Sequence, residues 1–331
     1  MNINWKNFLL SEHALFDSDT SIVFPAPGQE GDKRIYPVAD LGVLTVAGKD
    51  AAKFLQGQIT CNINDIIDIK SSLGALCNPK GRVITTFLLI KDAEVFLMVL
   101  PVELLASVKK RLQMYVLRSA VTLTDSSDEY CLIGLHYGEQ PGETSEHRFA
   151  TNRQENIVVD FQGRSLIIAD ADKAQMFWVE QLKLGFQPDD SAQWRYLDII
   201  AGIPWLGTAT SEQFIPQMLN LDKLGGISFN KGCYTGQEIV ARTHYLGKAK
   251  REMFLAECDG LTPPEPNATI IDDDTEHSIG KVLSAQSRQN RCRMLVVLQV
   301  SDADSYNLRL ENHNQDKITS AAKIICYRLT L

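Results

Sequence analysis

Cys233 is the residue best placed to do chemistry, because it lies in a glycine-bracketed loop, KGCYTGQE. Lys231 puts a cation two residues before the thiol, and the pattern predicts a helix with Thr235 as N-cap and Glu238 as capping-box partner. A neighbouring cation and a helix N-terminus both favour the thiolate, the nucleophilic form of cysteine. The alternative is a small buried residue in a tight turn. We expect a functional thiol whose site comprises Cys233, Lys231, Tyr234, Gln237 and Glu238.

Positive charge is concentrated in the same part of the chain. The formal net charge is −8, from 33 basic and 41 acidic residues, which argues against a protein coated with basic surface for nucleic acid. Between Phe229 and Arg251, however, five basic residues accompany one acid, Glu238, leaving 28 basic against 40 acidic residues, or −12, elsewhere. This stretch indicates either a local site for anions, such as carboxylates or a short run of phosphates, or a solvated loop.

The cysteine pattern and the hydropathy of the chain indicate whether metal sites, disulfides or membrane segments are expected. The seven cysteines are scattered, and none forms a C-x-x-C pair or lies near a metal-spaced histidine, so neither a zinc site nor a disulfide framework is indicated. No uncharged apolar run approaches the ~18 residues of a membrane span. The first residues, MNINWKNFLLSEHALF, do not read as a signal peptide. We expect a cytoplasmic protein with reduced thiols, without a membrane segment or a metal.

The elements that position these residues follow an α+β pattern. In the first part, turn chemistry at Asn78–Gly81 and an apolar helical repeat after Pro101 are the clearest local signals. The strands expected there are 40–46, 73–77, 83–90 and 95–100, with helices at 49–58 and 101–117. A second unit of similar size is expected to have strands at 121–124, 130–136, 157–161 and 165–168 and helices at 173–182 and 192–201.

The pattern changes beyond Arg251, where short apolar runs alternate with turn signals and no helical period is present. Several such strands predict a small antiparallel barrel or sandwich. The strands expected are 253–256, 279–283, 294–298 and 323–328. We therefore divide the chain into 1–120, 121–247 with the cysteine loop, and 248–331.

The cysteine segment also carries a resemblance. KGCYTGQE, together with the preceding FIPQMLNLDKLGGISF, resembles the signature of the YgfZ family, the folate-binding, tRNA-modification-associated relatives of the glycine-cleavage T-protein. The stretch from Val46 to Thr60 is similar to the first T-protein-like block, Asn78–Arg82 to its hairpin block, and Trp194–Pro204 to the block before the signature. The resemblance covers about residues 40 to 251.

What the resemblance implies is two ferredoxin-like units plus a C-terminal antiparallel β-barrel around a central opening that binds tetrahydrofolate. It further implies a monomer with a role in tRNA modification and iron–sulfur enzyme maintenance, with Cys233 as the functional thiol, and with iron–sulfur tRNA-modifying enzymes and tRNA as partners. By the resemblance, Trp194 occupies the position of one folate-contacting tryptophan and Leu41 that of the other. Among the candidate folate contacts, Asn78 and Arg82 either face the cavity or only form the turn, and Arg242 meets either the glutamate tail of folate or solvent.

Two positions bear on the reaction. T-proteins have an acidic pair where this chain has Thr85-Thr86, and a glutamate where it has Ile200. Transfer of an aminomethyl group to folate needs a carboxylate near the substrate amine, which threonine cannot supply. We expect an accessory protein rather than an aminomethyltransferase. The alternatives are a folate-dependent one-carbon transferase and a direct tRNA-binding factor that uses Lys231 through Arg251, including Lys248 and Lys250.

Overall fold

The computed structural model describes residues 1–25, 33–138, 148–153, 155–161, 163–247, 249–259, 262–289, 291–300, 308–311, 324–329 and 331. These form two compact units whose segments alternate along the chain. Unit 1 comprises Met1–Gln56, Asn62–Leu73 and Phe87–Trp194. Unit 2 comprises Gly57–Cys61, Gly74–Thr86 and Arg195–Leu331. The three-part division at 120 and 247 stays a prediction.

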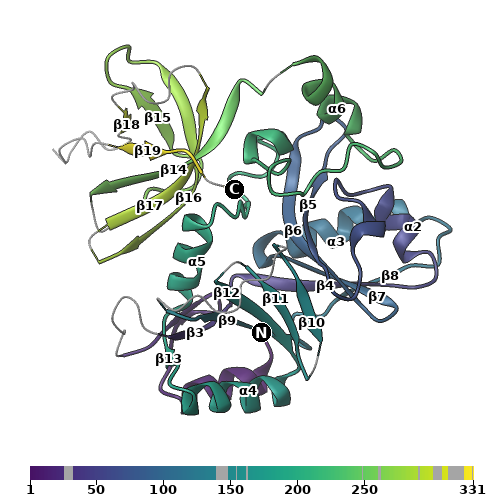
Figure 1. The fold of residues 1–331 in the computed structure, drawn as a ribbon, viewed down its shortest axis with the longest axis vertical. Helices are drawn as coiled ribbons and strands as arrows, with labels where there is room; N and C mark the ends of the chain where they lie inside the picture. Colours follow the sequence, from purple (N-terminus) through teal and green to yellow (C-terminus); the bar gives the residue numbers. More distant parts are fainter. Residues whose placement is uncertain are drawn as a thin grey trace. The chain divides into compact units, whose positions relative to one another are not determined.

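A six-stranded sheet forms one part of unit 1, in the order β10-β11-β12-β9-β3-β13 (Figure 1). The strands are β3 (Arg34–Pro37), β9 (Cys131–His136), β10 (Thr151–Arg153), β11 (Ile157–Asp160), β12 (Arg164–Ala169) and β13 (Gln187–Pro188). The pairs are antiparallel except β3 with β13. Short β1 (Leu15–Ser18) and β2 (Ser21–Val23) form a separate hairpin.

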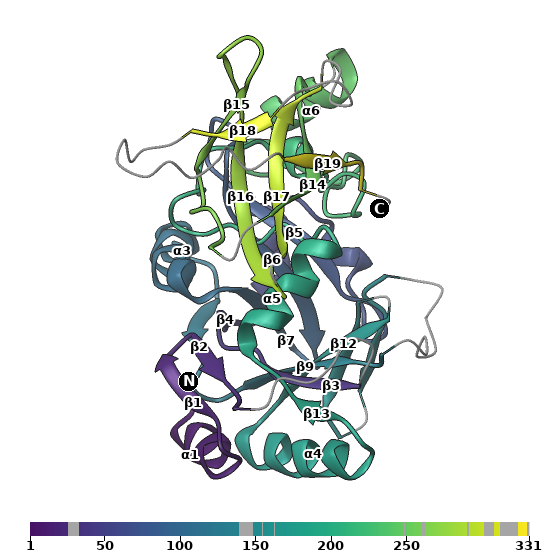
Figure 2. The same ribbon diagram turned by 90° about the vertical axis from the view of Figure 1, so that its left-hand side faces the viewer.

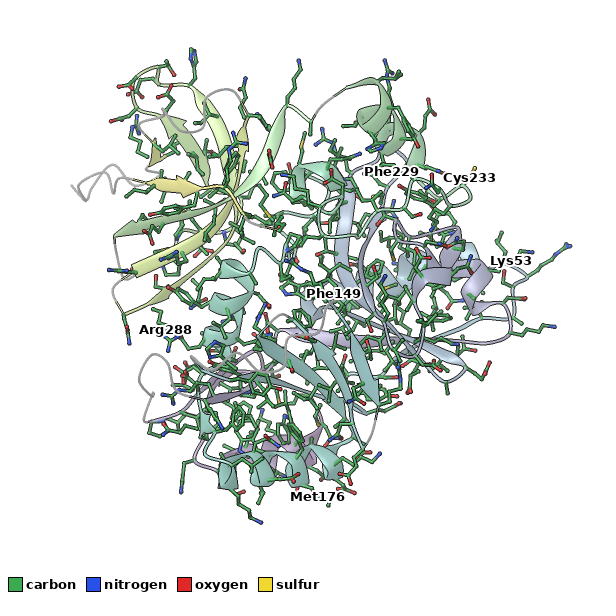
Figure 3. The ribbon with its side chains drawn as sticks, viewed as in Figure 1. Lys53, Phe149, Met176, Phe229, Cys233 and Arg288 are labelled. Atoms are coloured by element: carbon green, nitrogen blue, oxygen red, sulfur yellow. The ribbon has the colours of Figure 1, made fainter. Side chains whose placement is uncertain are left out.

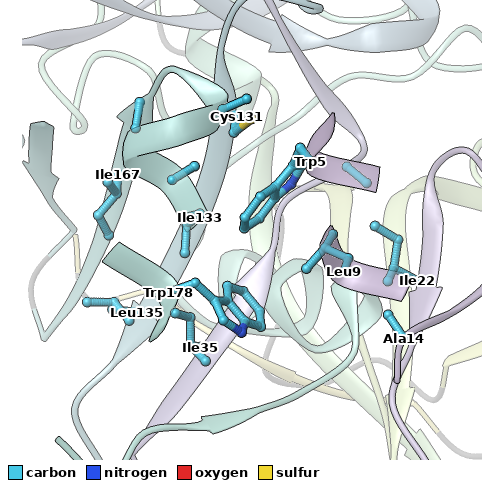
Figure 4. Close-up of a cluster of buried hydrophobic side chains, with 14 of the residues drawn as sticks. Trp5, Leu9, Ala14, Ile22, Ile35, Cys131, Ile133, Leu135, Ile167 and Trp178 are labelled. Atoms are coloured by element: carbon cyan, nitrogen blue, oxygen red, sulfur yellow. The ribbon is translucent and has the colours of Figure 1, made fainter. Parts of the chain in front are cut away.

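Two helices cover the apolar core of this sheet. They are α1 (Ile3–Ser11) and α4 (Ala171–Lys183), which contact each other (Figure 2). Trp5 from α1 and Trp178 from α4 meet edge-on with ring centroids 5.6 Å apart, above Ile133 and Ile35 of the sheet (Figure 4). The burial of two tryptophans stabilises this core strongly, since aromatic side chains bury ~150–250 Å² each. The sequence reading placed α4 within two residues but did not include α1.

The second sheet has the order β5-β6-β7-β4-β8. Its strands are β4 (Leu41–Ala47), β5 (Ser72–Cys77), β6 (Val83–Asp92), β7 (Val95–Pro101) and β8 (Thr122–Asp125). Helix α3 (Val102–Val116) packs on β4, where a Cβ on Gly42 would lie 2.7 Å from a Leu105 methyl carbon. The amphipathic helix predicted from Pro101 is thus confirmed, with Pro101 as its N-cap. Two short helices, α2 (Ala51–Gln56) and η1 (Ile63–Asp65), lie between β4 and β5 in the sequence.

The C-terminal part of unit 2 is an antiparallel sheet of order β18-β15-β16-β17-β14-β19, as the predicted barrel or sandwich requires. The sheet curls, and a β-bridge between Leu308 and Ile324 links the segments at its two edges. Its core includes Phe254, Val296 and Met294. The strands are β14 (Arg251–Asp259), β15 (Thr269–Asp272), β16 (Ser278–Arg288), β17 (Arg291–Gln299), β18 (Leu308–Leu310) and β19 (Ile325–Tyr327).

Three helical elements precede this sheet in the sequence. They are α5 (Ser191–Ile200), η2 (Pro216–Leu219) and α6 (Gln237–Leu246). Asn220, in the left-handed conformation just after η2, donates from its side chain to the Met253 carbonyl of β14 at 2.9 Å. The mixed α+β class and the C-terminal antiparallel sheet are therefore present, whereas the two ferredoxin-like units and the central opening stay predictions.

Candidate functional site

The cysteine loop of unit 2 is held at one end by Lys231. Its Nζ donates to the Ile59 and Cys61 carbonyl oxygens, at 2.7 Å each. Burial of the side chain lowers the pKa of the Lys231 ammonium to about 8. The ammonium is directed to these backbone carbonyls, and its expected role as a cation beside the thiol stays a prediction. Lys231 thus fastens the loop to the Gly57–Cys61 segment.

Thr60 strengthens the same attachment. Its hydroxyl donates to the Gly226 carbonyl at 2.7 Å and accepts from the Ala75 N–H at 2.8 Å, while its carbonyl accepts from the Ser228 N–H at 2.9 Å. The side chain is fully buried. Its own N–H also donates to the Ala75 carbonyl at 3.0 Å, so Thr60 joins β5, the Gly226 turn and the start of the cysteine loop.

Tyr234 and Gln237 hold the other side of the thiol. The Tyr234 ring is buried, which raises the pKa of its hydroxyl, and the Lys231 Nζ lies 5.1 Å from the ring centroid. The Tyr234 N–H donates to Gln237 Oε1 at 3.1 Å. Gln237 thus closes the turn after the cysteine, and both residues have positioning roles.

Helix α6 begins one residue later than the sequence predicts. Its N-cap is Gly236, at φ +85°, with no side-chain capping bond, so the expected capping box of Thr235 and Glu238 does not form. A left-handed residue is required at this point, and glycine adopts that conformation without steric cost. Glu238 is exposed in the first helical turn, where a carboxylate suits the helix dipole.

The glycine also permits close approach of the 78–82 hairpin. A Cβ on Gly236 would lie 2.5 Å from the Asn78 carbonyl oxygen, and a Cβ on Gly81 would lie 2.8 Å from Ile239 Cβ. The Asn78 side chain forms the hairpin itself, because its Oδ1 accepts from the Lys80 and Arg82 N–H groups. The hairpin block and the cysteine block, far apart in sequence, therefore meet backbone to backbone.

Cys233 projects outward from this fastened loop (Figure 3). It is the exposed member of the seven cysteines, of which Cys326 is half-buried and the others are buried. Within the part of the chain that the structure describes, no hydrogen bond to its sulfur is found. An accessible thiol on a loop with anchors at both ends can reach a large partner, and it can act as a nucleophile, a redox group or a ligand.

Four of the five candidate folate residues, all except the exposed Arg242, are buried or make contacts within the protein. Trp194 is buried in unit 1, with the Arg164 guanidinium 4.5 Å from its ring centroid and the Gly134 backbone against its other atoms. Leu41 is buried in β4, opposite Pro101. The Asn78 oxygen is used in its turn, as described above. In unit 2, the Arg82 guanidinium donates to the Gln213 carbonyl.

Two positions in unit 2 relate to the T-protein chemistry. Thr85 and Thr86 are buried, and the Thr86 hydroxyl donates to the Pro204 carbonyl at 2.6 Å, so this pair supports the backbone. The second position is Ile200, and a carboxylate that the sequence analysis did not single out lies two residues before it. Asp198 of α5 is buried, and its Oδ2 accepts from the Trp205 indole N–H at 2.8 Å. An acid one helical turn before Gly202, followed by a tryptophan, was the available signal.

Exposed rings and cations follow the loop. Arg242, His244 and Tyr245 of α6 are exposed, and Phe229 stacks on His244. Lys250 and Arg251 are exposed as well, whereas Lys248 lies outside the described residues. Among the residues that the structure describes, no cluster of three potential metal-ligating side chains occurs, and no helix has the length and apolar character to span a membrane.

Comparison with known proteins finds two curated sequences similar to most of the chain. It is 28% identical over 313 residues to the tRNA-modifying protein YgfZ of Colwellia psychrerythraea, covering 91% of this chain and 96% of that protein. It is 29% identical over 319 residues to the tRNA-modifying protein YgfZ of Hamiltonella defensa, covering 92% and 89%. No family model matches the chain.

The fold has a solved counterpart in the glycine cleavage system aminomethyltransferase T from Bartonella henselae. The TM-score is 0.70 at 14% identity, covering 90% of this chain and 86% of the other. At this identity the likeness concerns the fold alone. The chain is thus similar to the two YgfZ proteins over nearly its whole length, as the cysteine segment predicts, and it has a T-protein-like fold.

Proposed function

We propose that this protein is an accessory factor in tRNA modification that acts through the thiol of Cys233. The observation that carries the proposal is the exposure of Cys233 on a loop fastened by Lys231 on one side and by Tyr234 and Gly236 on the other. Two relatives carry the name tRNA-modifying protein. Such a thiol suits reaction with a group on a macromolecular partner, since its position does not depend on closure of a pocket.

The residues next to the thiol have structural tasks in this proposal. Lys231 and Gln237 hold the ends of the turn, and Tyr234 fills the space beneath it. Redox, covalent and cluster-contact chemistry all begin from an accessible sulfur, and maintenance of iron–sulfur tRNA-modifying enzymes is the role that the resemblance implies. The monomeric state and cytoplasmic location stay predictions.

Complementation tests the thiol. In a strain that lacks the gene, we expect Cys233→Ser to leave thiolated tRNA nucleosides, measured by mass spectrometry, at the level of the deletion. Cys326→Ser, at a half-buried cysteine, is the matched control and should restore them. Full restoration by Cys233→Ser, at equal protein level, would refute the thiol role.

We further propose that tetrahydrofolate binds in unit 2, on Asp198 and Trp205 rather than on Leu41 and Trp194. A carboxylate is the group that pairs with the N–H edge of a pterin, and Trp205 is half-buried beside it. These two side chains fit the polar edge and the ring of such a ligand, and tetrahydrofolate would supply one-carbon carrying capacity when bound. Their indole–carboxylate bond would orient the ring.

Fluorescence titration distinguishes the two tryptophans. We expect tetrahydrofolate to quench the wild type and Trp194→Phe alike, and Trp205→Phe much less. Asp198→Asn should weaken binding while circular dichroism stays unchanged. Equal quenching in Trp205→Phe, with the response lost in Trp194→Phe, would instead support the contact implied by the resemblance.

A further inference from the structure

Three aromatic rings gather at the surface of unit 2 beside the cysteine loop. Phe229 and His244 stack with centroids 3.7 Å apart and an interplanar angle of 14°. Tyr245 meets the His244 ring edge-on at 4.8 Å and the Phe229 ring at 6.2 Å. We name Phe229, His244, Tyr245 and the neighbouring Arg242 the aromatic platform. It lies on the segment that carries Cys233, since α6 begins four residues after the thiol.

The platform does not serve the core of the unit. Val240 is the buried residue of α6, whereas Tyr245 is 65% exposed and the following Leu246 is 81% exposed. Phe229 is half-buried, whereas the His244 and Tyr245 rings are exposed and so forgo the stabilisation that burial of an aromatic side chain provides. Their grouping on one surface is the type of exposed apolar patch that marks a binding site.

The basic residues around the rings indicate what kind of ligand the platform binds. Arg242 precedes Tyr245 by three residues, so both lie on one face of α6, and Lys250 and Arg251 follow at the end of the segment. The same stretch contains one acid, Glu238, in a chain of net charge −8. Cations interleaved with exposed rings suit a ligand that has both phosphates and flat apolar faces. Single-stranded nucleic acid is such a ligand.

We propose that the aromatic platform binds unpaired nucleotides of an RNA, with a base stacked on Tyr245 and the backbone phosphates facing Arg242. This inference rests on the proposed function, because it takes tRNA as the partner. Stacking on rings accepts any base, so the platform would hold a loop or end without reading its sequence. It would bring RNA to the segment that presents the thiol.

Fluorescence anisotropy with a labelled single-stranded RNA of about 12 nucleotides, and separately with bulk tRNA, tests the proposal. We expect Tyr245→Ala to weaken binding roughly 5- to 150-fold, the range for loss of one stacked base, and Tyr245→Phe to retain it. Leu246→Ala, an exposed apolar neighbour without a ring, is the control and should bind as the wild type. Arg242→Gln should reduce the slope of log affinity against log salt by about 0.7, whereas Tyr245→Ala should leave that slope unchanged.

The outcomes separate this proposal from the thiol role. Cys233→Ser should bind RNA as the wild type, and Tyr245→Ala should keep the wild-type rate of Cys233 alkylation. Wild-type RNA affinity in both Tyr245→Ala and the double variant Phe229→Ala, His244→Ala would overturn the proposal. It would also be overturned if these variants lost a protein partner in pull-down while RNA affinity stayed unchanged. Loss of RNA affinity in Tyr245→Ala alongside full complementation by Cys233→Ser would sustain the platform and overturn the thiol role.

Discussion

The meeting of the hairpin with the cysteine loop predicts a graded response to alanine at three glycines. Gly236 has φ +85°, and a Cβ there would lie 2.5 Å from the Asn78 carbonyl oxygen. Gly225 has φ +73° but no atom within 4 Å of such a Cβ. Gly232 has open space around the added Cβ and no positive φ to relieve. Alanine should therefore be tolerated at Gly232 and should strain the backbone at Gly225. At Gly236 it should both strain the backbone and clash with the Asn78 carbonyl oxygen.

The magnitudes follow from these differences. A left-handed conformation costs an alanine ~1–2 kcal/mol relative to glycine, which is the expected local loss for Gly225→Ala. Forcing an extra methyl group against the Asn78 backbone adds ~1–3 kcal/mol, so Gly236→Ala should lose about 2–5 kcal/mol in total. At Gly232 the change should be near zero, or slightly stabilising through the unfolded chain.

Hydrogen exchange measured by mass spectrometry is the suitable assay, because unfolding of a chain with two units does not report on one loop. Peptides that cover 231–246 should exchange faster in Gly236→Ala and stay unchanged in Gly232→Ala. Gly225→Ala should show a smaller, separate effect around its own turn. If Gly236→Ala exchanged no faster than Gly225→Ala in peptides 231–246, the close approach to Asn78 would be refuted.

Three further predictions concern groups of the same unit. Because burial lowers the pKa of Lys231 to about 8, about half of its amine should be unprotonated at pH 8, against under ~1% for an ordinary lysine; competitive acylation should therefore label it first, and labelling at the rate of exposed lysines would contradict this. Cys233 should be the first thiol to react with a disulfide reagent in the folded protein, and Cys233→Ser should leave only slow reaction. Thr86→Val should lose ~1–2 kcal/mol of stability with its bond to the Pro204 carbonyl, and Thr86→Ser should retain most of it.

Local chemistry in the sequence accounts for much of the fold. Apolar periodicity located α3, α4 and α5 to within about two residues, because a helix that covers a sheet must place apolar side chains every three or four positions. Helix α1 was not identified: its apolar residues are not confined to one face, and only Trp5 and Leu9 of the helix are buried. Packing of Trp5 against Trp178, rather than a local sequence pattern, holds this helix on the sheet.

Sites were harder to predict than elements, for a related reason. The TGQE pattern satisfied a capping rule, yet Gly236 begins the helix because its left-handed backbone fits against Asn78. Lys231 lies two residues before Cys233 in the chain, but the carbonyls of Ile59 and Cys61 accept its hydrogen bonds. Hydrogen bonds between segments some 170 residues apart cannot be predicted from the spacing of neighbouring residues.

By itself, the sequence determined that the chain has a thiol in a glycine-bracketed loop, a positive segment around it and a similarity to the YgfZ proteins. Only the tertiary structure decided that Cys233 is exposed while Trp194 is buried beneath Arg164, and that Phe229 stacks on His244. The physical reason is that residue type and spacing set local conformation, whereas exposure and partnership depend on which distant segments pack together.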